Sequence, residues 1–302
     1  MGFLVDVKRF TNAEVVESEP MSKHTTLHVG GNADYFIKPL WLKDLLTILE
    51  LCDKYRLKHT VIGLGSNLLV SDSGFRGAII SLENLNTIKK RGNEIVSYSG
   101  AKLKDLCKFS IGLNLVGFEG LVDIPASVGG AVFMNAGANG YQIKDYITRV
   151  GVIDKFGLKE YSQKECKFGY RKSRFINSNE IIVYALFNFP KGDKNKAIEK
   201  IEGFRLKRKN TQPKGFTAGS VFKNPKGNFS ALLIESLNLK GFKIGGAKVS
   251  EKHANFIVCE KGAKSQDVYN LIKHVQNLVF NTYGILLDSE IRLLGDFNDI
   301  NG

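Results

Sequence analysis

The sequence contains few cysteines, and they are widely spaced. Only four occur in 302 residues, at Cys52, Cys107, Cys166 and Cys259, and none belongs to a CxxC pair. A disulfide framework or a zinc site would need paired or clustered cysteines, so this spacing argues against both. Buried thiols in a reducing compartment fit the pattern better.

Long apolar stretches are also absent. No uncharged apolar run approaches the roughly 18 residues that a membrane span needs. The first ten residues, MGFLVDVKRF, carry Asp6, Lys8 and Arg9 among their apolar side chains, which interrupts the apolar core that a signal peptide requires. We therefore expect a cytoplasmic protein with no membrane contact and no metal site.

Acidic residues are outnumbered by basic ones. Lys and Arg total 43 against 30 Asp and Glu, which gives a formal net charge of +13. Such an excess of positive charge is typical of proteins that bind nucleic acid and of enzymes whose ligands carry several phosphates. It can also reflect a proteome-wide bias that says nothing about partners. No RNP motif, zinc finger or helix-turn-helix with a basic recognition helix is present, so we expect no nucleic-acid partner. A basic nucleic-acid-binding protein remains an alternative that rests on charge alone.

Length and composition indicate a folded globular protein with two domains. Hydrophobic residues make up 43% and charged residues 24% of the chain, which is typical of soluble proteins. A chain of 302 residues is too long for one ordinary core. The composition changes at residues 191–195, KGDKN, so we expect a first domain over residues 1–194, with subdomains 1–82 and 83–194, and a second over 195–302 whose last residues can pack back on the first.

Hydrophobic spacing predicts a mixture of helices and strands with a β-β-α-β opening. Helices are expected over residues 41–55, 102–114, 197–209, 230–237 and 265–283, the last with Ser265 as N-cap and Gly284 at its end. Strands are expected on both sides of Gly30 and Gly31 within residues 24–39, and over 59–63, 68–72, 78–82, 94–98, 149–154, 180–190, 255–259 and 285–294. The basic helix over 197–209 suits either a solvated face or attraction of an anionic ligand.

A glycine pair follows the strand predicted over residues 59–63. The segment GLGSN, from Gly63 to Asn67, offers backbone N–H groups at a tight turn, which is a weak signal for a phosphate. The dinucleotide fingerprint GxGxxG is absent because Leu68 occupies its third glycine position, and strands rather than a helix are expected next. A Rossmann unit is therefore not predicted here.

The most unusual stretch runs from Gly117 to Gly140, GFEGLVDIPASVGGAVFMNAGANG. Its glycines and small residues predict a loop rather than a helix or strand, and ordered loops of this length are uncommon unless they have a function. Five glycines allow positive φ or close approach of another group, namely Gly120, Gly129, Gly130, Gly137 and Gly140. Main-chain donors of this kind suit phosphate or a planar ring system. A glycine-rich surface connector is the alternative, although the interleaved apolar residues favour burial.

Seven motifs along the chain resemble the UDP-N-acetylenolpyruvoylglucosamine reductase family. In order they are TTLHVGGNADYF, GLGSNLLVSDSGFRG, GFEGLVDIPASVGGAVFMNAGANG, FGYRKSRF, AGSVFKNP, GGAKVSEKHANFIV and GILLDSEIRLLG. The resemblance implies an α+β fold, with an FAD-binding module of the vanillyl-alcohol-oxidase type followed by a smaller α/β substrate domain. The interval from Arg171 to Ser220 is 49 residues, which implies the shorter form without a substrate-covering tyrosine insertion.

The resemblance also implies a reaction and its site residues. NADPH would reduce FAD, and the flavin would pass a hydride to UDP-N-acetylglucosamine enolpyruvate to give UDP-N-acetylmuramate for peptidoglycan. Three motif positions match catalytic residues: Ser220 as proton donor, Arg171 as ligand of the carboxylate and oxyanion, and Glu290 as a protonated hydrogen-bond donor.

Cofactor and substrate contacts are implied by the same motifs. The residues expected to bind FAD are Gly63, Leu64, Gly65, Ser66, Asn67, Leu68, Glu119, Ile124, Pro125, Ala126, Ser127, Gly129, Gly130, Asn135, Ala136 and Gly137. The residues expected to bind the carboxylate and diphosphate ends of the substrate are Tyr170, Lys223 and Asn224. His253 is expected to be structural, and the protein is expected to be a monomer.

The chain departs from the family pattern at four positions. Ala126 and Ser127 replace glycine and threonine, His28 stands where arginine is expected, and Asn139 where tyrosine is usual. If the family needs positive φ at position 126, alanine would weaken flavin binding. A different flavoprotein built on the same module, such as an oxidase of a small alcohol or sugar, is the alternative enzyme.

Overall fold

The computed structural model describes residues 2–154 and 156–298 and separates into two compact units. Unit 1 consists of Met1–Val16, Phe36–Leu64 and Ala78–Lys207, and unit 2 of Glu17–Tyr35, Gly65–Gly77 and Arg208–Gly302. Both units are therefore assembled from segments that are distant in sequence. The division passes through strands β1 (Glu14–Pro20), β2 (Asn32–Lys38) and β5 (Phe75–Ser81).

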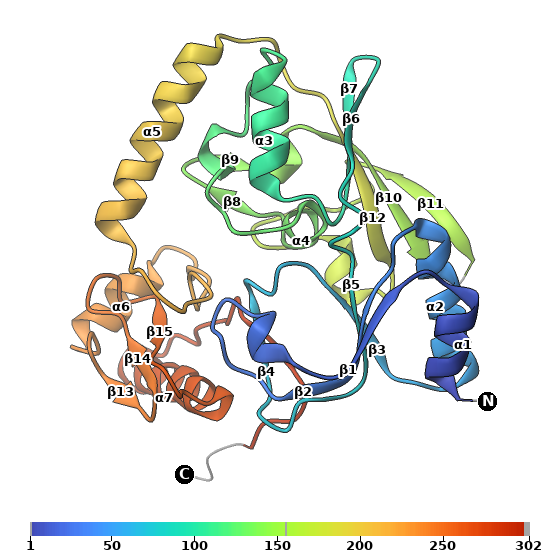
Figure 1. The fold of residues 1–302 in the computed structure, drawn as a ribbon. Coiled ribbons are helices and arrows are strands. Elements are labelled where there is room, and N and C mark those ends of the chain that lie inside the picture. The colour runs from blue at the N-terminus through green and yellow to red at the C-terminus, as the bar shows by residue number, and fades with distance from the viewer. Residues whose placement is uncertain (1, 155, 299–302) are drawn as a thin grey trace. The chain divides into compact units, whose positions relative to one another are not determined.

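The main sheet of unit 1 has five antiparallel strands (Figure 1). Their order is β11 (Gly157–Ser162), β10 (Ile147–Asp154), β12 (Ile181–Phe187), β7 (Glu94–Tyr98) and β6 (Ile88–Arg91). On the central strand β12, the neighbouring residues Ala185 and Leu186 are both buried. Since neighbours in a strand point to opposite faces, the sheet is covered on both sides here.

Two helices and an aromatic cluster fill the core beside this sheet. The helices are α3 (Leu103–Gly112) and α4 (Val128–Met134). The ring of Phe118 lies 5.6 Å from that of Phe187 and 4.8 Å from that of Phe189, edge to face in both pairs. Edge-to-face contacts of buried rings add to the free energy gained by burying them.

The remaining elements of unit 1 are smaller. Helices α1 (Phe3–Phe10) and α2 (Leu42–Lys54) pack together, and β3 (His59–Ile62) pairs in parallel with β5. The sheet of order β1-β2-β5-β3 to which this pair belongs is divided by the boundary between the units. Short elements are η2 (Glu119–Leu121), β8 (Gly137–Ala138), β9 (Tyr141–Gln142), η3 (Ile143–Asp145) and η4 (Arg174–Asn177). The long helix α5 (Lys194–Thr211) reaches the boundary between the units.

Unit 2 is built around a small antiparallel sheet and a long helix. The sheet has the order β13 (Lys243–Ile244), β14 (Ala247–Val249) and β15 (Ile257–Cys259). Helix α7 (Ser265–Tyr283) packs on β13 and β14, with α6 (Ser230–Ser236) beside it. The unit also contains η1 (Met21–Lys23) and a parallel pair of β4 (Leu68–Val70) and β16 (Arg292–Leu294). None of the helices in the described residues is long and apolar enough to cross a membrane.

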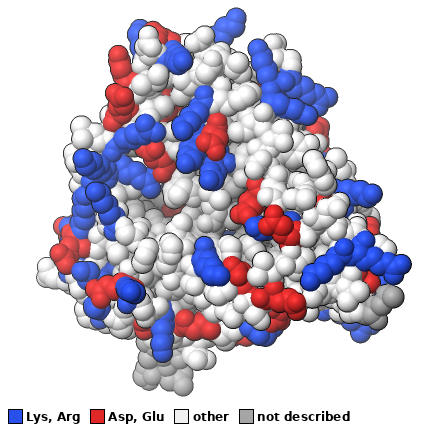
Figure 2. Space-filling model, viewed as in Figure 1, with Lys and Arg blue, Asp and Glu red and all other residues white. Residues whose placement is uncertain are grey.

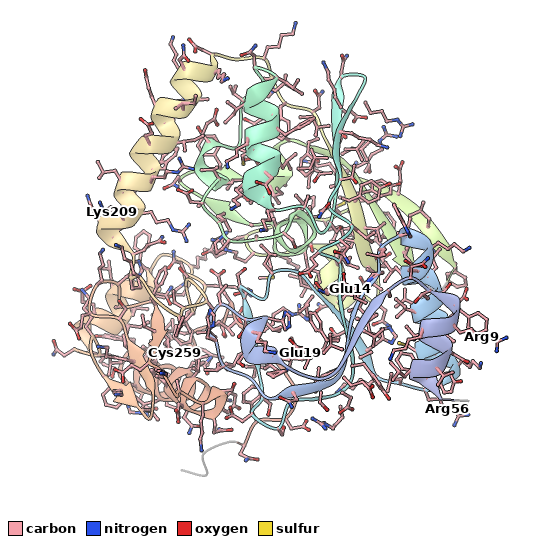
Figure 3. All side chains as sticks on the ribbon, viewed as in Figure 1. Arg9, Glu14, Glu19, Arg56, Lys209 and Cys259 are labelled. Carbon is pink, nitrogen blue, oxygen red and sulfur yellow. The ribbon has the colours of Figure 1, made fainter. Side chains whose placement is uncertain are left out.

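The amphipathic helices and most strands confirm the sequence predictions, and the mixed content confirms the α+β class. Helix α7 begins at Ser265, although its N-cap is Lys264 rather than Ser265, and it ends at Gly284, whose φ is +68°. The four cysteines are buried free thiols, as expected, and Figure 3 labels Cys259, which lies on β15.

Helix α1 was not predicted, and the strand expected before Gly30 was wrong. In residues 24–30 the hydrogen bonds are local: the His28 N–H donates to Thr25 O (3.2 Å) and the Thr25 hydroxyl to Val29 O (2.9 Å). His28 itself has φ of +55°, which turns the chain. The burial of alternate residues Leu27 and Val29 imitates a strand pattern without forming a ladder.

The last strand was predicted too long. Residues 285–291 make only one isolated bridge, between Ser289 and Phe222, before β16 begins at Arg292. The Ser289 hydroxyl accepts a hydrogen bond from the Ile291 N–H (3.1 Å). This local bond replaces the regular ladder, because a backbone donor that is already satisfied by a side chain does not pair with a neighbouring strand.

Candidate active site

The glycine-rich stretch contains a helix rather than one long loop. Helix α4 starts directly after Ser127, whose hydroxyl oxygen accepts a hydrogen bond from the Gly130 N–H (3.2 Å). An oxygen that binds an N–H in the first turn is a standard N-cap. The loop prediction was therefore wrong for residues 128–134, because the side-chain cap and the tight packing outweigh the low helix propensity of two glycines.

Close packing explains the first of these glycines. A Cβ atom at Gly129 would lie 2.7 Å from the Cβ of Ser99, and the Gly129 N–H donates to Ser99 O (2.9 Å). The neighbouring Val128 N–H donates to Ala101 O (2.8 Å), so residues 128 and 129 are bonded to the segment after β7. Gly129 is needed for close approach and not for positive φ.

Ala126 has no strained backbone conformation, so the possible need for positive φ at this position does not arise. It is absent from the residues with positive φ, and its N–H and C=O bond to Ile124 O (2.8 Å) and the Leu103 N–H (2.9 Å). Alanine fits this backbone without cost. Positive φ occurs instead at Asn135 (+42°) and Asn139 (+53°), and asparagine tolerates this region better than most residues.

The two predicted cofactor segments meet within unit 1. A Cβ atom at Gly63 would lie 2.4 Å from the Ser127 hydroxyl oxygen. The end of β3 and the start of α4 therefore lie close together, with the Ser127 hydroxyl directly beside the Gly63 backbone. Only glycine at position 63 permits this approach.

A tight turn presents Tyr170 and Arg171 in the same unit. Gly169 and Lys172 exchange both backbone hydrogen bonds (2.9 and 3.2 Å), and Arg171 between them has φ of +49°. The Arg171 Nη2 donates to Gly137 O (3.0 Å), and its guanidinium carbon lies 5.2 Å from the centre of the Tyr170 ring. Tyr170 is 55% exposed, so its ring lies at the protein surface beside the arginine.

Asn135 connects this turn to α4. Its side-chain nitrogen donates to Gly169 O (2.7 Å) and Gln142 Oε1 (3.1 Å), while its Oδ1 accepts from the Lys144 N–H (3.2 Å). The residue is fully buried. Both amide protons and the oxygen thus bind protein groups, which suits a residue that holds the Arg171 turn rather than one that contacts a ligand directly.

Glu119 is a second buried polar residue of the stretch. Its carboxylate accepts a hydrogen bond from the Gly117 N–H (3.1 Å), and only 3% of the residue is exposed. Burial, and then the Glu119 charge, raises the pKa of Tyr141. Gly117 has φ of +136°, and a Cβ there would meet the Tyr146 ring at 2.4 Å. Glu119 therefore fixes the turn that leads into the stretch.

Ser220 lies in unit 2 on a short extended segment. It forms a bridge with Phe256, and the next residue, Val221, donates its N–H to Asn255 O (2.9 Å). The Asn255 side chain then accepts from the Phe222 N–H (2.9 Å) and donates to Phe222 O (2.8 Å). One edge of the Ser220 segment is thus bonded continuously to residues 255 and 256.

Glu290 is bonded to the other edge of this segment. The Glu290 N–H donates to Val221 O (2.8 Å), and the Lys223 N–H donates to Asp288 O (2.9 Å). The Asn67 side chain donates to Glu290 O (2.8 Å), while Asn67 O accepts from the Arg292 N–H (3.0 Å). Unit 2 therefore places Ser220, Glu290 and the end of the GLGSN motif on adjoining segments.

Lys223 and Asn224 follow Ser220 and have protein partners of their own. The Lys223 ammonium lies 2.6 Å from Asp288 Oδ2, and Asn224 Oδ1 accepts from the Ser230 N–H (3.1 Å) at the start of α6. The Ser230 hydroxyl donates to Lys223 O (2.5 Å). These bonds order the turn after Ser220, although an ion pair at the surface contributes little to stability.

The predicted site residues are divided between the two units. Unit 1 contains Gly63, Leu64, Glu119, Ile124, Pro125, Ala126, Ser127, Gly129, Gly130, Asn135, Ala136, Gly137, Tyr170 and Arg171. Unit 2 contains Gly65, Ser66, Asn67, Leu68, Ser220, Lys223, Asn224 and Glu290. The division falls between Leu64 and Gly65, inside the GLGSN motif.

Comparisons with known proteins agree over nearly the whole chain. Residues 33–158 match the model of an FAD binding domain, and residues 212–294 match that of UDP-N-acetylenolpyruvoylglucosamine reductase, C-terminal domain. A UDP-N-acetylenolpyruvoylglucosamine reductase from Carboxydothermus hydrogenoformans is 42% identical over 288 residues, which are 94% of this chain and 95% of that protein. One from Listeria welshimeri is 40% identical, over 96% of this chain and 98% of that protein. This chain belongs to the UDP-N-acetylenolpyruvoylglucosamine reductase family.

A solved structure supports the fold of the family member. The crystal structure of UDP-N-acetylenolpyruvylglucosamine reductase from Thermus caldophilus superposes with a TM-score of 0.81 at 31% identity. The match covers 95% of this chain and all of that chain. The α+β fold with an FAD-binding module followed by a smaller α/β domain is thereby confirmed.

The residues present in this family member fit a flavin. Gly63, Gly65 and Gly129 leave no room for a Cβ atom, because each is in contact with backbone or with a fixed serine. Gly63 is exposed, and a backbone without a side chain there suits close approach of a phosphate or ring edge. Gly65 and Gly129 are buried, and the Gly129 N–H is bonded to Ser99 O, so these two glycines serve packing. Within residues 2–154 and 156–298, no cluster of His, Cys, Asp or Glu could hold a metal ion.

Two residues that shape the site were not predicted as such. Asn255 and Asn135 each bond a segment that carries a predicted catalytic residue, through all polar atoms of the side chain. Asn135 was predicted to bind cofactor, and Asn255 was given no role. Both asparagines lie inside matched motifs. However, Asn255 is 33 residues from its partner Phe222, and Asn135 is 34 residues from its partner Gly169, so the sequence spacing does not reveal these bonds.

Proposed function

We propose that this chain is an FAD-dependent oxidoreductase that reduces UDP-N-acetylglucosamine enolpyruvate to UDP-N-acetylmuramate with NADPH, a step of peptidoglycan precursor synthesis. One observation carries the assignment of chemistry: the Glu290 N–H bonds to Val221 O at 2.8 Å, directly after Ser220. A weak acid and a carboxyl group are thus held on paired segments within one unit. FAD, when bound, supplies hydride chemistry that no side chain of the protein provides.

Ser220 is proposed to give a proton to the substrate. Addition of a hydride to the enolpyruvyl double bond leaves negative charge next to the substrate carboxylate, and that carbon must gain a proton. A serine hydroxyl is a weak acid, but a carbanion-like enolate is basic enough to take its proton when the two are aligned. Such general acid catalysis contributes about 10²–10⁴-fold.

Glu290 and Arg171 are proposed to stabilise the developing charge. An ionised Glu290 would repel an anionic substrate, so we expect the acid form, which donates a hydrogen bond to the enolate. Arg171 has a planar fork of donors that fits a carboxylate. The turn of Gly169 and Lys172 and the bond to Gly137 O fix the position of this arginine before substrate binds.

The remaining site residues are proposed to contact substrate or FAD. Tyr170, Lys223 and Asn224 are proposed to contact substrate, and the cofactor residues of the GLGSN and glycine-rich motifs to contact FAD, except Asn135, whose side chain is fully bonded to protein groups. We propose residues 1–194 as the FAD domain and 195–302 as the substrate domain, in a monomer that works in the cytoplasm.

The 18-residue helix α5 is rich in Lys and Arg (Figure 2), and one of them, Arg205, pairs with Asp123 at 3.2 Å.

Separation of the two half-reactions tests this function. Purified protein should be yellow, NADPH should bleach it, and the enolpyruvyl nucleotide should restore the colour in stopped flow. Ser220→Ala should leave bleaching by NADPH nearly normal and slow reoxidation by at least about 10²-fold.

Other outcomes would point elsewhere. Colourless protein without released FAD would refute an enzyme of this kind. NADPH oxidation independent of the enolpyruvyl nucleotide would favour a different flavoprotein. Equal loss in both half-reactions of Ser220→Ala would remove Ser220 as proton donor.

A further inference from the structure

Asn255 holds the peptide units that follow Ser220 as a neighbouring strand would. Its backbone oxygen accepts from the Val221 N–H at 2.9 Å. Its side chain binds both polar backbone groups of Phe222: Oδ1 accepts from the N–H at 2.9 Å and Nδ2 donates to the C=O at 2.8 Å. A carboxamide that binds the backbone N–H and C=O of one residue takes the place of the hydrogen bonds that a paired strand would make there.

These bonds are shielded from water. Asn255 is 4% exposed, and Val221 and Phe222 are each 2% exposed. Loss of the partner of a buried backbone group is destabilising, because water cannot replace the bond. The segment after Ser220 therefore has one strongly preferred position.

His253 in turn accepts a hydrogen bond from the backbone of Asn255. The Asn255 N–H points to Nδ1 of His253 at 3.2 Å, which requires an unprotonated Nδ1. The Phe256 N–H donates to His253 O (3.0 Å), and the imidazole lies edge-on to the Phe256 ring at 4.7 Å. Burial lowers the pKa of His253, in keeping with a neutral ring.

The opposite edge of the same segment carries Glu290. Since Val221 accepts from the Glu290 N–H and donates to Asn255 O, Val221 lies between the two. Asn255 thus fixes the register of the segment against Glu290 on one side and sets the position of the adjacent Ser220 on the other.

We infer that Asn255 is a positioning residue for proton transfer by Ser220, which it performs through the Val221–Phe222 backbone without touching substrate. This inference rests on the proposed function, because it assumes that Ser220 is the acid. Proton transfer requires donor and acceptor in hydrogen-bond geometry, and a shift of about 1 Å can cost about 10²-fold in rate. Loss of the side-chain clamp should shift the segment enough to disturb this geometry.

The experiment is a double-mutant cycle on the two half-reactions. Asn255→Ala should slow reoxidation of NADPH-reduced enzyme by the enolpyruvyl nucleotide by about 10²-fold, and leave reduction by NADPH within about twofold of the native rate. In the Ser220→Ala background, Asn255→Ala should slow reoxidation by less than about threefold, because the group that it positions is gone. Reoxidation by Asn255→Ala should also show a larger solvent deuterium isotope effect than native enzyme.

Matched variants separate positioning from stability. Val279→Ala on α7 removes core volume in the same unit without a hydrogen bond to the Ser220 segment. It should lower Tm while leaving both half-reactions near native. Asn255→Asp keeps the shape and the Oδ1 acceptor but replaces the donor to Phe222 O, so it should reproduce the reoxidation defect if Asn255→Ala fails to fold.

The outcomes distinguish this inference from the function on which it rests. If Ser220→Ala does not slow reoxidation selectively, the assignment of Ser220 as acid fails. If it does, the inference alone is overturned by any of three results: native reoxidation in the Asn255 variants, equal slowing of both half-reactions, or multiplicative effects in the double mutant.

Discussion

Gly129→Ala and Gly203→Ala make the same chemical change inside two helices, and we expect opposite effects on stability. Neither glycine has positive φ. A Cβ at Gly203 in α5 would meet no atom within 4 Å, whereas a Cβ at Gly129 in α4 would lie 2.7 Å from the Ser99 Cβ and 2.8 Å from its Oγ. The pair therefore separates helix propensity from packing.

The magnitudes follow from these contacts. Alanine gains up to about 1 kcal/mol over glycine inside a helix, and at Gly203 nothing opposes that gain. At Gly129 the new carbon lies about 1 Å inside normal contact distance. Ser99 cannot yield easily, because its Oγ donates to Ile182 O at 2.7 Å and its backbone oxygen accepts from the Gly129 N–H. Overpacking of this kind costs about 1–3 kcal/mol.

We therefore expect Gly203→Ala to raise Tm slightly and Gly129→Ala to lower it. The two should differ by about 1–3 kcal/mol in the free energy of unfolding. Thermal and urea unfolding of cofactor-free protein measure this difference, because a bound ligand would add its own contribution to stability. Equal stability of the two variants would refute the contact between α4 and Ser99, and with it the explanation of why glycine occurs in this helix.

Three further predictions concern the cysteines, His253 and Arg171. All four cysteines are buried, and burial raises the pKa of Cys259 to about 12. An aromatic disulfide reagent at pH 8 should therefore label no cysteine in folded protein and four after unfolding. Labelling of folded protein would contradict this prediction. Burial lowers the pKa of His253 below its ordinary value of 6.5, so the unfolded chain binds the proton more readily and stability should fall as pH drops below about 6.5. His253→Asn, which keeps an acceptor for the Asn255 N–H, should flatten that part of a Tm-against-pH curve, and an unchanged slope would exclude His253 as the cause. Arg171→Lys keeps the charge but loses the planar fork, so it should slow reoxidation by about 10–10²-fold with FAD content unchanged, whereas a native rate would argue against bidentate binding.

Local pattern and motif identity predicted much of this protein. The spacing of apolar residues in α2 and α7 is sufficient to place both helices, because one face of each is buried. Ser220, Arg171 and Glu290 were predicted as site residues because they occur in motifs with a known order. Their roles follow from residue type and motif, and they stay a prediction.

What could not be predicted depends on contacts between distant residues. Helix α4 was missed because its glycines suggest a loop until the closeness of Ser99 is known. Asn255 was overlooked because nothing near it in sequence indicates that its amide binds Phe222, 33 residues away. The strand predicted before Gly30 was wrong because burial of Leu27 and Val29 alternates in a turn as it does in a strand.

The parallel pairing of β4 with β16 has a consequence for how the protein is made. Arg292 of β16 lies 292 − 68 = 224 residues after Leu68 of β4, so Leu68–Val70 is synthesised long before its partner Arg292–Leu294. The pairing of β4 in unit 2 therefore cannot form until Arg292–Leu294 has been synthesised, and β4 is left with an unpaired edge until then, which is a hazard for aggregation. For the same reason, a fragment that begins at Arg208 would lack β4 and the Asn67 bond to Glu290 O, so the smaller half of this protein cannot be produced intact as one continuous piece.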